Sequence, residues 1–408
     1  MLQALPLVFI LAGLVLYTVL AGADFGAGMW RLLAGSGDRG ERIRDHTHHS
    51  MGPVWEANHV WLIFVLTVTW TAYPTFLGSI ASTLAVPFFI AALGIILRGA
   101  SYALRSGASG GRELHVVDGA FAVASLVTPF ALGAMAGGIA GERVPVGNAA
   151  GGLFSSWCNP VAILIGVLAV TFSAYLAAVY LAADAARRGE SELEEAFRRR
   201  ALAAGVLAGV LAVAGLFVVH SDAHSLYTGL LHGAARAVLI VSLLAGTAAI
   251  GLVATRRFEP ARYVAAVAVA AVVAGWAFAR YPTLLPGLTV DQAAAPHDTL
   301  VAVVVSVLAG GAILFPSLGL LFALLLRGHL GEPGEDAQPS PGVAATVPLA
   351  TRGTAARARL AVALLIIGVG MLNAADAPWA HAIGVVSLFG FMIVAFAAIV
   401  PAALAQDA

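Results

Sequence analysis

Residues 51–74 read MGPVWEANHVWLIFVLTVTWTAYP and place a carboxylate, Glu56, at the start of an otherwise apolar run. An acid at the mouth of a membrane helix is costly unless it is hydrogen-bonded, protonated or wetted, so it is a candidate functional residue. The preceding apolar run ends in GADFGAG, residues 22–28, which contains Asp24. A chain that turns back at that membrane face would bring both acids to similar depth. The stretch therefore predicts a membrane helix that carries one of a pair of acids at one end.

The composition of the whole chain indicates an integral membrane protein. Of its 408 residues, 60% are hydrophobic and 11% are charged, whereas soluble domains contain about 25% charged residues. The apolar runs suit α-helices and are too long for barrel strands. The formal net charge is zero, which gives no indication of a nucleic-acid partner, and the single Cys158 disfavours a thiolate metal site. We expect an all-α, polytopic membrane helical bundle.

Nine apolar segments are long enough to cross a hydrocarbon core of about 30 Å. They lie at 5–30, 54–74, 78–103, 116–138, 160–183, 200–219, 233–254, 261–280 and 299–326. No basic residue precedes the first segment, so we expect a retained span and not a signal peptide. A linker rich in proline, glycine and charge follows, and two more apolar runs, 360–372 and 379–400, close the chain, of which the first is short. The predicted organisation is a membrane domain over 1–327, a polar linker over 328–359 and about two extra hydrophobic helices over 360–408.

The distribution of arginine predicts the orientation of the chain in the membrane. All 22 basic residues are arginines, and 19 of them follow odd-numbered spans, whereas Arg143, Arg236 and Arg280 lie at the other face. By the positive-inside rule, the arginine-rich loops are cytoplasmic and the N-terminus is outside. This orientation places Asp24, Glu56 and a third acid, Asp118, near the cytoplasmic face.

Three carboxylates near one membrane face suit a proton entrance. The alternative is helix capping, because the helix dipole favours an acid in the first turn. Capping would account for Glu56 and Asp118. It does not account for Asp24, which lies at the C-terminal end of its helix, where a negative charge is disfavoured.

Histidine and arginine residues offer further candidates. His46, His48 and His49 cluster in HTHHS, which we expect in a loop, whereas haem ligation in a bundle usually needs histidines at depth on facing helices. Solvated loop polarity is therefore the favoured role, although the sequence leaves open whether these histidines bind anything. Arg98 is expected to extend to the inner surface, the alternative being a pair with an acid.

Glycines of the first span suggest how it packs. Gly22, Gly26 and Gly28 put a smooth patch on this helix. Such patches allow close helix packing in membranes, and we favour that role over ligand binding.

Several motifs together resemble subunit II of the cytochrome bd quinol oxidases. The matching pieces are GADFGAGMW (22–30), GPVWEANHVWLI (52–63), LRGASYALR (97–105), LVTPFALGAMAGG (126–138), FRRRAL (197–202) and RYPTLLPGLT (280–289). They occur in order over about the first 330 residues. GPVWEANHVWLI is long and unusual, so a chance match is improbable.

The resemblance implies a fold, a partner and a reaction. It implies nine core spans in two four-helix groups plus a peripheral helix, and a related, haem-bearing subunit I that carries haems b and d and a quinol site. Electrons from quinol would reduce O2 to water in a bacterial plasma membrane, with protons taken from the cytoplasm, and so generate a membrane potential. No catalytic residue, haem ligand or metal ligand is expected on this chain. A structural quinone and a small third subunit stay open.

The resemblance also assigns roles to individual residues. It implies that Asp24 and Glu56 are proton-path candidates, with Trp55 and Asn58 beside Glu56 and Trp61 near the route of O2. The alternative function is a proton-coupled secondary transporter. Its support is a weak parallel repeat between WTAYPTFL (70–77) and WAFARYPTLL (276–285).

Overall fold

The computed structural model describes residues 1–51, 55–105, 112–326, 352–374 and 377–404. It divides into two compact units, Met1–Gly319 and Leu320–Ala408, which are described separately. The side chains of some helical residues near the ends of the described ranges also lie outside the description, including those of 48–49, 51, 55–57, 102–105 and 112–116.

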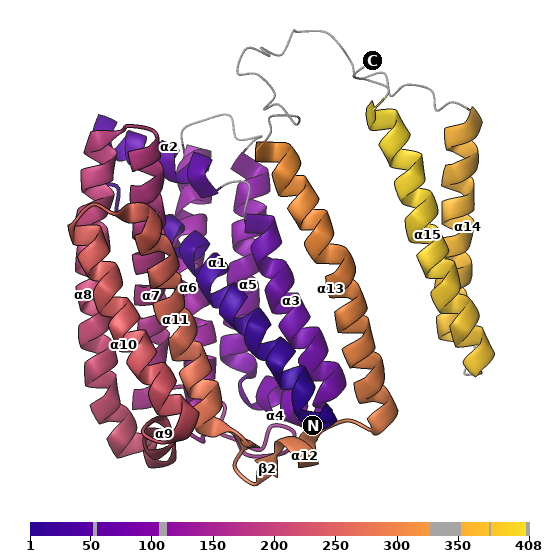
Figure 1. Cartoon of the computed structure of the whole chain (residues 1–408), viewed down its shortest axis with the longest axis horizontal. Helices are drawn as coiled ribbons and strands as arrows, with labels where there is room; N and C mark the ends of the chain where they lie inside the picture. The colour runs from indigo at the N-terminus through magenta and orange to yellow at the C-terminus, as the bar shows by residue number, and fades with distance from the viewer. Residues whose placement is uncertain (52–54, 106–111, 327–351, 375–376, 405–408) are drawn as a thin grey trace. The chain divides into compact units, whose positions relative to one another are not determined.

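Long helices make up almost all of the first unit (Figure 1). The elements that begin in it are a short 3-10 helix (Leu2–Ala4), α1 (Leu5–Leu32), α2 (Asp38–Met51), α3 (Trp55–Ala72), α4 (Pro74–Thr83), α5 (Ala85–Arg105), α6 (Arg112–Ala140), α7 (Pro160–Arg187), α8 (Ser191–Asp222), α9 (His224–Leu230), α10 (Gly233–Ala254), α11 (Phe258–Arg280), β1 (Thr283–Leu285), β2 (Leu288–Thr289), α12 (Val290–Ala293) and α13 (His297–Leu326).

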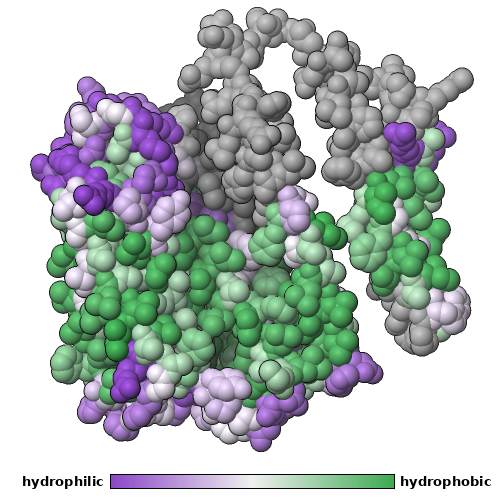
Figure 2. All heavy atoms as spheres, viewed as in Figure 1, coloured by the Kyte–Doolittle hydropathy of each residue, from purple (hydrophilic) through white to green (hydrophobic). Residues whose placement is uncertain are grey.

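The described helices have the dimensions of membrane spans. Seven of them are long and apolar enough to cross a bilayer, and the bent pair of α4 and α5 would make an eighth. Figure 2 shows a hydrophobic band between two hydrophilic ends on the face of the first unit in view. The prediction of a helical membrane bundle is confirmed, whereas the count of nine spans stays a prediction.

The span predicted at 78–103 is wrong as a single helix. The chain breaks at Leu84, and α4 and α5 differ in direction by 86°. Pro87 explains the position of the break, because a proline ring clashes with the carbonyl four residues earlier, here that of Thr83, the last residue of α4. Pro74 similarly occupies the first position of α4, where its fixed backbone is favoured.

Helix α1 lies at the centre of the packing and contacts α3, α6, α7 and α11. Its glycines make this close approach possible. A Cβ on Gly26 would lie 1.9 Å from the Ser173 carbonyl oxygen in α7, and a Cβ on Gly28 would lie 2.1 Å from Ser125 Oγ in α6. The predicted role in close helix packing is confirmed for Gly26 and Gly28, whereas a Cβ on Gly22 would have its nearest contact at 3.5 Å, an ordinary distance.

Residues 38–51, which we expected in a loop, form helix α2. One side of α2 is buried, with Ile43 1%, His46 5% and Thr47 2% exposed. Ile43 joins a core cluster built mainly from α7 and α8. The sequence did not indicate this helix, because only a few residues of α2 face the bundle and the segment therefore lacks a clear apolar periodicity.

At the opposite end of the first unit, a small hairpin of β1 and β2 leads into α12 (Figure 1). Leu285 and Leu288 of the hairpin join the core cluster that includes α3 and α6. In the second unit, α14 (Arg352–Ala374) packs against α15 (Pro378–Leu404). A Cβ on Gly368 would lie 2.7 Å from the side chain of Leu388, so these two helices also approach closely.

Candidate functional site

Asp24 of α1 forms a buried ion pair with Arg98 of α5. Arg98 Nη2 lies 2.6 Å from Asp24 Oδ2, and both side chains are at most 5% exposed. Arg98 also donates a hydrogen bond to Ser125 Oγ of α6. Its guanidinium carbon lies 4.9 Å from the ring centre of Phe25 and 4.3 Å from that of Phe121. The expectation that Arg98 extends to the inner surface is therefore wrong, because its guanidinium lies inside the bundle in contact with a carboxylate, a hydroxyl and two aromatic rings.

A second ion pair lies beside the first. Arg31 Nη2 of α1 lies 3.0 Å from Asp118 Oδ1 of α6, and the Asp118 side chain is 37% exposed. The Arg31 guanidinium lies 5.0 Å from the centre of the same Phe121 ring. The structure thus brings two of the predicted acids, Asp24 and Asp118, into one cluster around Phe121. Each acid has an arginine partner.

Helix α3 adds polar groups next to this cluster. Asn58 is buried, and its Nδ2 donates to the Leu20 carbonyl oxygen at 3.3 Å. The ring of His59 lies 6.1 Å from those of Tyr17 and Phe25. It also lies within electrostatic range of the ion pair between Asp24 and Arg98. Within the described part of the chain, Tyr17 Oη and Asn58 Oδ1 are buried without a hydrogen-bond partner. Such groups are usually satisfied by ordered water.

For two of the predicted site residues, the structure describes the backbone but not the side chain. The side chains of Glu56 and Trp55 lie outside the described residues, although their backbone forms the first turn of α3. Trp61 is half-buried, and its ring contacts Phe64 edge-on with 6.2 Å between centres.

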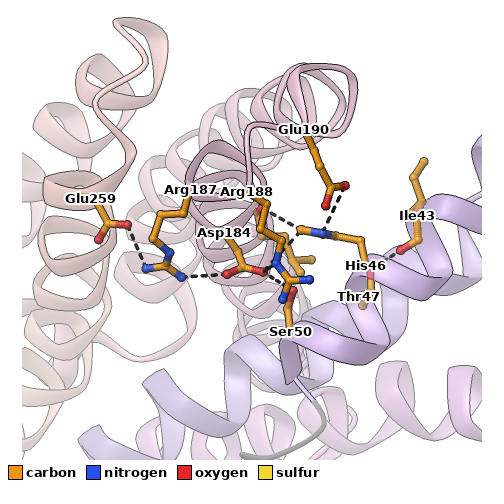
Figure 3. Close-up of polar contacts among 10 residues, drawn as sticks. Ile43, His46, Thr47, Ser50, Asp184, Arg187, Arg188, Glu190 and Glu259 are labelled. Atoms are coloured by element: carbon orange, nitrogen blue, oxygen red, sulfur yellow. Dashed lines mark hydrogen bonds and ion pairs between the residues drawn. The ribbon is translucent and has the colours of Figure 1, made fainter. Parts of the chain in front are cut away.

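The histidine cluster of α2 differs from its prediction. His46 is buried and not solvated, with Nε2 3.2 Å from the Leu181 carbonyl oxygen (Figure 3). The side chains of His48 and His49 lie outside the described residues. Among the residues that the structure describes, no group of three or more histidine, cysteine or acidic side chains is arranged to hold a metal ion.

A separate polar cluster lies at the other end of the bundle. Glu142 accepts hydrogen bonds from Arg280 and from Ser225. Burial would raise the pKa of the Glu142 carboxyl, but these hydrogen bonds and the positive charge of Arg280 outweigh it and hold that pKa below its usual range. The cluster joins the loop after α6 to α9 and to the end of α11.

Comparison with known proteins decides the family. A family model described as cytochrome bd terminal oxidase subunit II matches residues 2–325. The chain belongs to this family. With its apolar helices, it is a multi-pass membrane protein.

Individual relatives of this subunit II chain are distant. Cytochrome bd ubiquinol oxidase subunit 2 of Bacillus subtilis (strain 168) is 31% identical over 116 residues, which cover 28% of this chain and 33% of the relative. Cytochrome bd-I ubiquinol oxidase subunit 2 of Escherichia coli (strain K12) is 26% identical over 226 residues, which cover 52% of this chain and 56% of the relative. The alignments thus span about a third to a little over half of these relatives.

A solved structure shares the fold of subunit II. A chain of the bd oxidase from Geobacillus thermodenitrificans superposes with a TM-score of 0.62 at 24% sequence identity, over 80% of this chain and 99% of that chain.

Sequence analysis of subunit II missed the partners of the acids. The sequence does not identify Arg31, Ser125 and His59 as neighbours of the acids, and it offers the pairing of Arg98 with an acid only as the alternative. The available signal was the position of Arg98 inside the apolar segment 78–103, because an arginine within a span usually pairs with an acid.

Proposed function

We propose that this chain is the non-haem subunit II of a membrane-bound cytochrome bd-type quinol:O2 oxidoreductase. The observation that carries the proposal is the family match over residues 2–325. In the complex, a partner subunit I holds haems b and d, quinol supplies the electrons, and O2 is reduced to water. Subunit II lies in the bacterial plasma membrane with its N-terminus outside, and it supports access of protons and O2 to the partner.

The acids near the arginine-rich end are proposed to form part of a proton path. Asp118 is partly exposed, whereas Asp24 is buried, so the two ion pairs lead from the surface into the bundle. Protonation of either acid would leave Arg31 or Arg98 without its counter-charge, which is unfavourable in an apolar surrounding. We therefore assign proton exchange to Glu56 and assign to the two ion pairs the role of fixing the charges around the path.

Groups between α1 and α3 support such a path. Tyr17 Oη and Asn58 Oδ1, which lack protein partners among the described residues, would hold water beside the acids. Carboxylates linked by water are a common means of moving protons through membrane proteins. The apolar surroundings of Trp61 are consistent with the proposed route of O2.

Purification of the chain from its natural membrane tests the proposal. We expect it to copurify with a larger haem protein, and the assembly to consume O2 with quinol. Glu56→Gln should lower turnover by at least about tenfold while the haem spectrum is retained, because general acid–base groups contribute about 10²–10⁴-fold. Glu41→Gln is the matched control, since Glu41 is an exposed acid on α2.

Three results would contradict the proposal. A haem bound wholly by this chain would exclude a non-haem subunit. Normal turnover of the Glu56→Gln assembly would exclude the proton path. Proton-coupled solute uptake by this chain without any partner would favour the transporter alternative.

A further inference from the structure

Three arginines gather around the connection between α1 and α2 at the arginine-rich end of the bundle. Arg200 of α8 donates a hydrogen bond to the Leu33 carbonyl oxygen at 3.4 Å, and Arg44 of α2 donates one to the Gly35 carbonyl oxygen at 2.7 Å. Arg39, in the first turn of α2, lies within electrostatic range of Arg200. A guanidinium has five N–H donors, so most donors of Arg200 and Arg44 have no acceptor in the described chain.

Acidic side chains do not balance this positive charge locally. Within the part of the chain that the structure describes, no carboxylate oxygen lies within 4.0 Å of the guanidinium of Arg200 or Arg44. The two acids in the first turn of α2 are exposed to solvent. Arg39 Nε is 3.9 Å from Glu192 Oε1, but the same carboxylate also pairs with Arg42. One acid is thus shared by two arginines, and the arginines around the connection keep an excess of positive charge.

The arginines lie where the apolar part of the bundle begins. Residues 201–219 of α8, directly after Arg200, contain no charged side chain. At the end of α1, Leu32 and Leu33 are 55% and 62% exposed. The guanidinium carbon of Arg200 lies 5.5 Å from the ring centre of Trp30, also on α1. Positive charge, an aromatic ring and exposed leucine side chains occur together at the boundary between lipid headgroups and acyl chains.

We propose that this basic cluster, Arg39, Arg44 and Arg200, binds the phosphate group of one anionic phospholipid, whose acyl chains lie against Leu32 and Leu33. Arginine suits this ligand because its planar set of donors matches the oxygen atoms of a phosphate. Basic pockets at the ends of membrane helices bind the headgroups of acidic lipids for the same reason. A free phosphate ion offers the same oxygen atoms but no apolar part for the two leucines to contact. The bound lipid joins α8 to the connection between α1 and α2.

Native mass spectrometry of the protein, isolated in detergent with the partners that it keeps, tests the proposal. Dioleoylphosphatidylglycerol is the anionic probe, and dioleoylphosphatidylcholine, which has the same acyl chains and no net charge, is the reference. We expect one phosphatidylglycerol molecule to bind at least about tenfold more tightly than phosphatidylcholine, because several arginines attract its charge. Inorganic phosphate at a similar concentration should not displace it, since the ion has no acyl chains.

Substitutions of single arginines locate the lipid. Arg200→Gln and Arg39→Gln should each weaken the binding of phosphatidylglycerol by about fivefold and leave the binding of phosphatidylcholine unchanged. Arg199→Gln is the matched control, because it removes the same charge from the neighbouring position of α8. Arg199 is 74% exposed and pairs with Glu195, so its loss should change the affinity by less than about twofold. The Arg39 side chain is 62% exposed, so Arg39→Gln tests the cluster without disturbing the packing of α8.

Equal affinity of the natural chain for the two lipids would overturn the proposal. Displacement of phosphatidylglycerol by inorganic phosphate would also overturn it and would indicate a site for the free ion. A loss of affinity in Arg199→Gln as large as that in Arg200→Gln and Arg39→Gln would show that the net charge of the surface attracts the lipid, and not this cluster. Absence of bound phosphatidylglycerol would mean that a partner chain covers the arginines. The measurement does not depend on oxidase activity, so it stands apart from the proposed function.

Discussion

The ion pair between Asp24 and Arg98 dominates the described site at the scale of single residues. Removing two charges from water costs several kcal/mol per ion, and close contact with additional hydrogen bonds offsets that cost. Arg98 has its carboxylate at 2.6 Å and a hydroxyl partner in Ser125. Removal of one of the two charges should therefore cost more stability than replacement of the whole pair, because it leaves the other charge buried and unpaired.

Substitutions of Asp24 and Arg98 test whether the ion pair has a structural role. Asp24→Asn should destabilise the assembly by about 3–5 kcal/mol, because it leaves the Arg98 charge buried and unpaired. The double change Asp24→Asn with Arg98→Gln should cost less than Asp24→Asn alone. Thermal unfolding of the purified complex measures both, with the exposed Arg39→Gln as control. Equal stability of Asp24→Asn and the natural chain would show that the ion pair is not formed in the complex.

At the end of the bundle opposite to α2, the Glu142 carboxylate predicts that the stability of the protein depends on pH. The pKa of Glu142 is lower in the folded chain than its ordinary value of 4.5, so its contribution to stability is present above pH 4.5 and is lost as the pH falls below it. The carboxylate is 40% exposed, and solvent screening limits the contribution to about 0.5 kcal/mol. Glu142→Gln should flatten the loss of thermal stability between about pH 5 and pH 3, whereas the fully exposed Asp298→Asn should not.

At the scale of elements, packing depends on which glycine faces a neighbouring backbone. A Cβ on Gly26 would meet the Ser173 backbone of α7 at 1.9 Å, whereas one on Gly22 would have its nearest contact at 3.5 Å. Both glycines are on α1, so helix propensity affects them alike. Backbone atoms cannot move aside as a flexible side chain can, so the consequences of a methyl group differ.

Alanine at these positions gives a matched pair. Gly26→Ala should lower the stability of the complex by about 1–3 kcal/mol through overpacking. Gly22→Ala should be neutral or slightly stabilising, since alanine favours a helix over glycine by about 1 kcal/mol. Thermal unfolding of both variants is the measurement. A similar loss for both would show that α1 and α7 do not approach as closely in the complex.

At the scale of the whole molecule, the family match and the compact units divide the chain at similar places. The family model ends at residue 325, and the first compact unit ends at Gly319. Helices α14 and α15 follow and pack on each other. Residues 328–408 therefore lie beyond the part of the chain that the family shares.

Truncation tests whether the added segment is required. A chain that ends at Arg327 should still assemble with the proposed haem-bearing partner and, in that complex, consume O2 at a rate within about twofold of the full chain, since it keeps the matched region complete. The haem spectrum and the O2 consumption of the purified complex give the answer. Loss of haem from the truncated complex would instead assign α14 and α15 to assembly.

The class of fold and the family follow from the sequence alone. Apolar length specifies membrane helices because the bilayer has a fixed thickness, and the motif around Glu56 carries the family resemblance. Pro87 also carries a local signal for the break between α4 and α5.

The partners of the buried polar residues, in contrast, are set by how the helices pack in three dimensions. Asp24 and Arg98 are 74 positions apart in the sequence, and His46 meets the acids Asp184 and Glu190 across more than 130. Such pairs depend on how helices pack, which local periodicity does not specify. Burial makes these contacts necessary, because a charge or ring nitrogen inside the bundle needs a partner that only a neighbouring helix supplies.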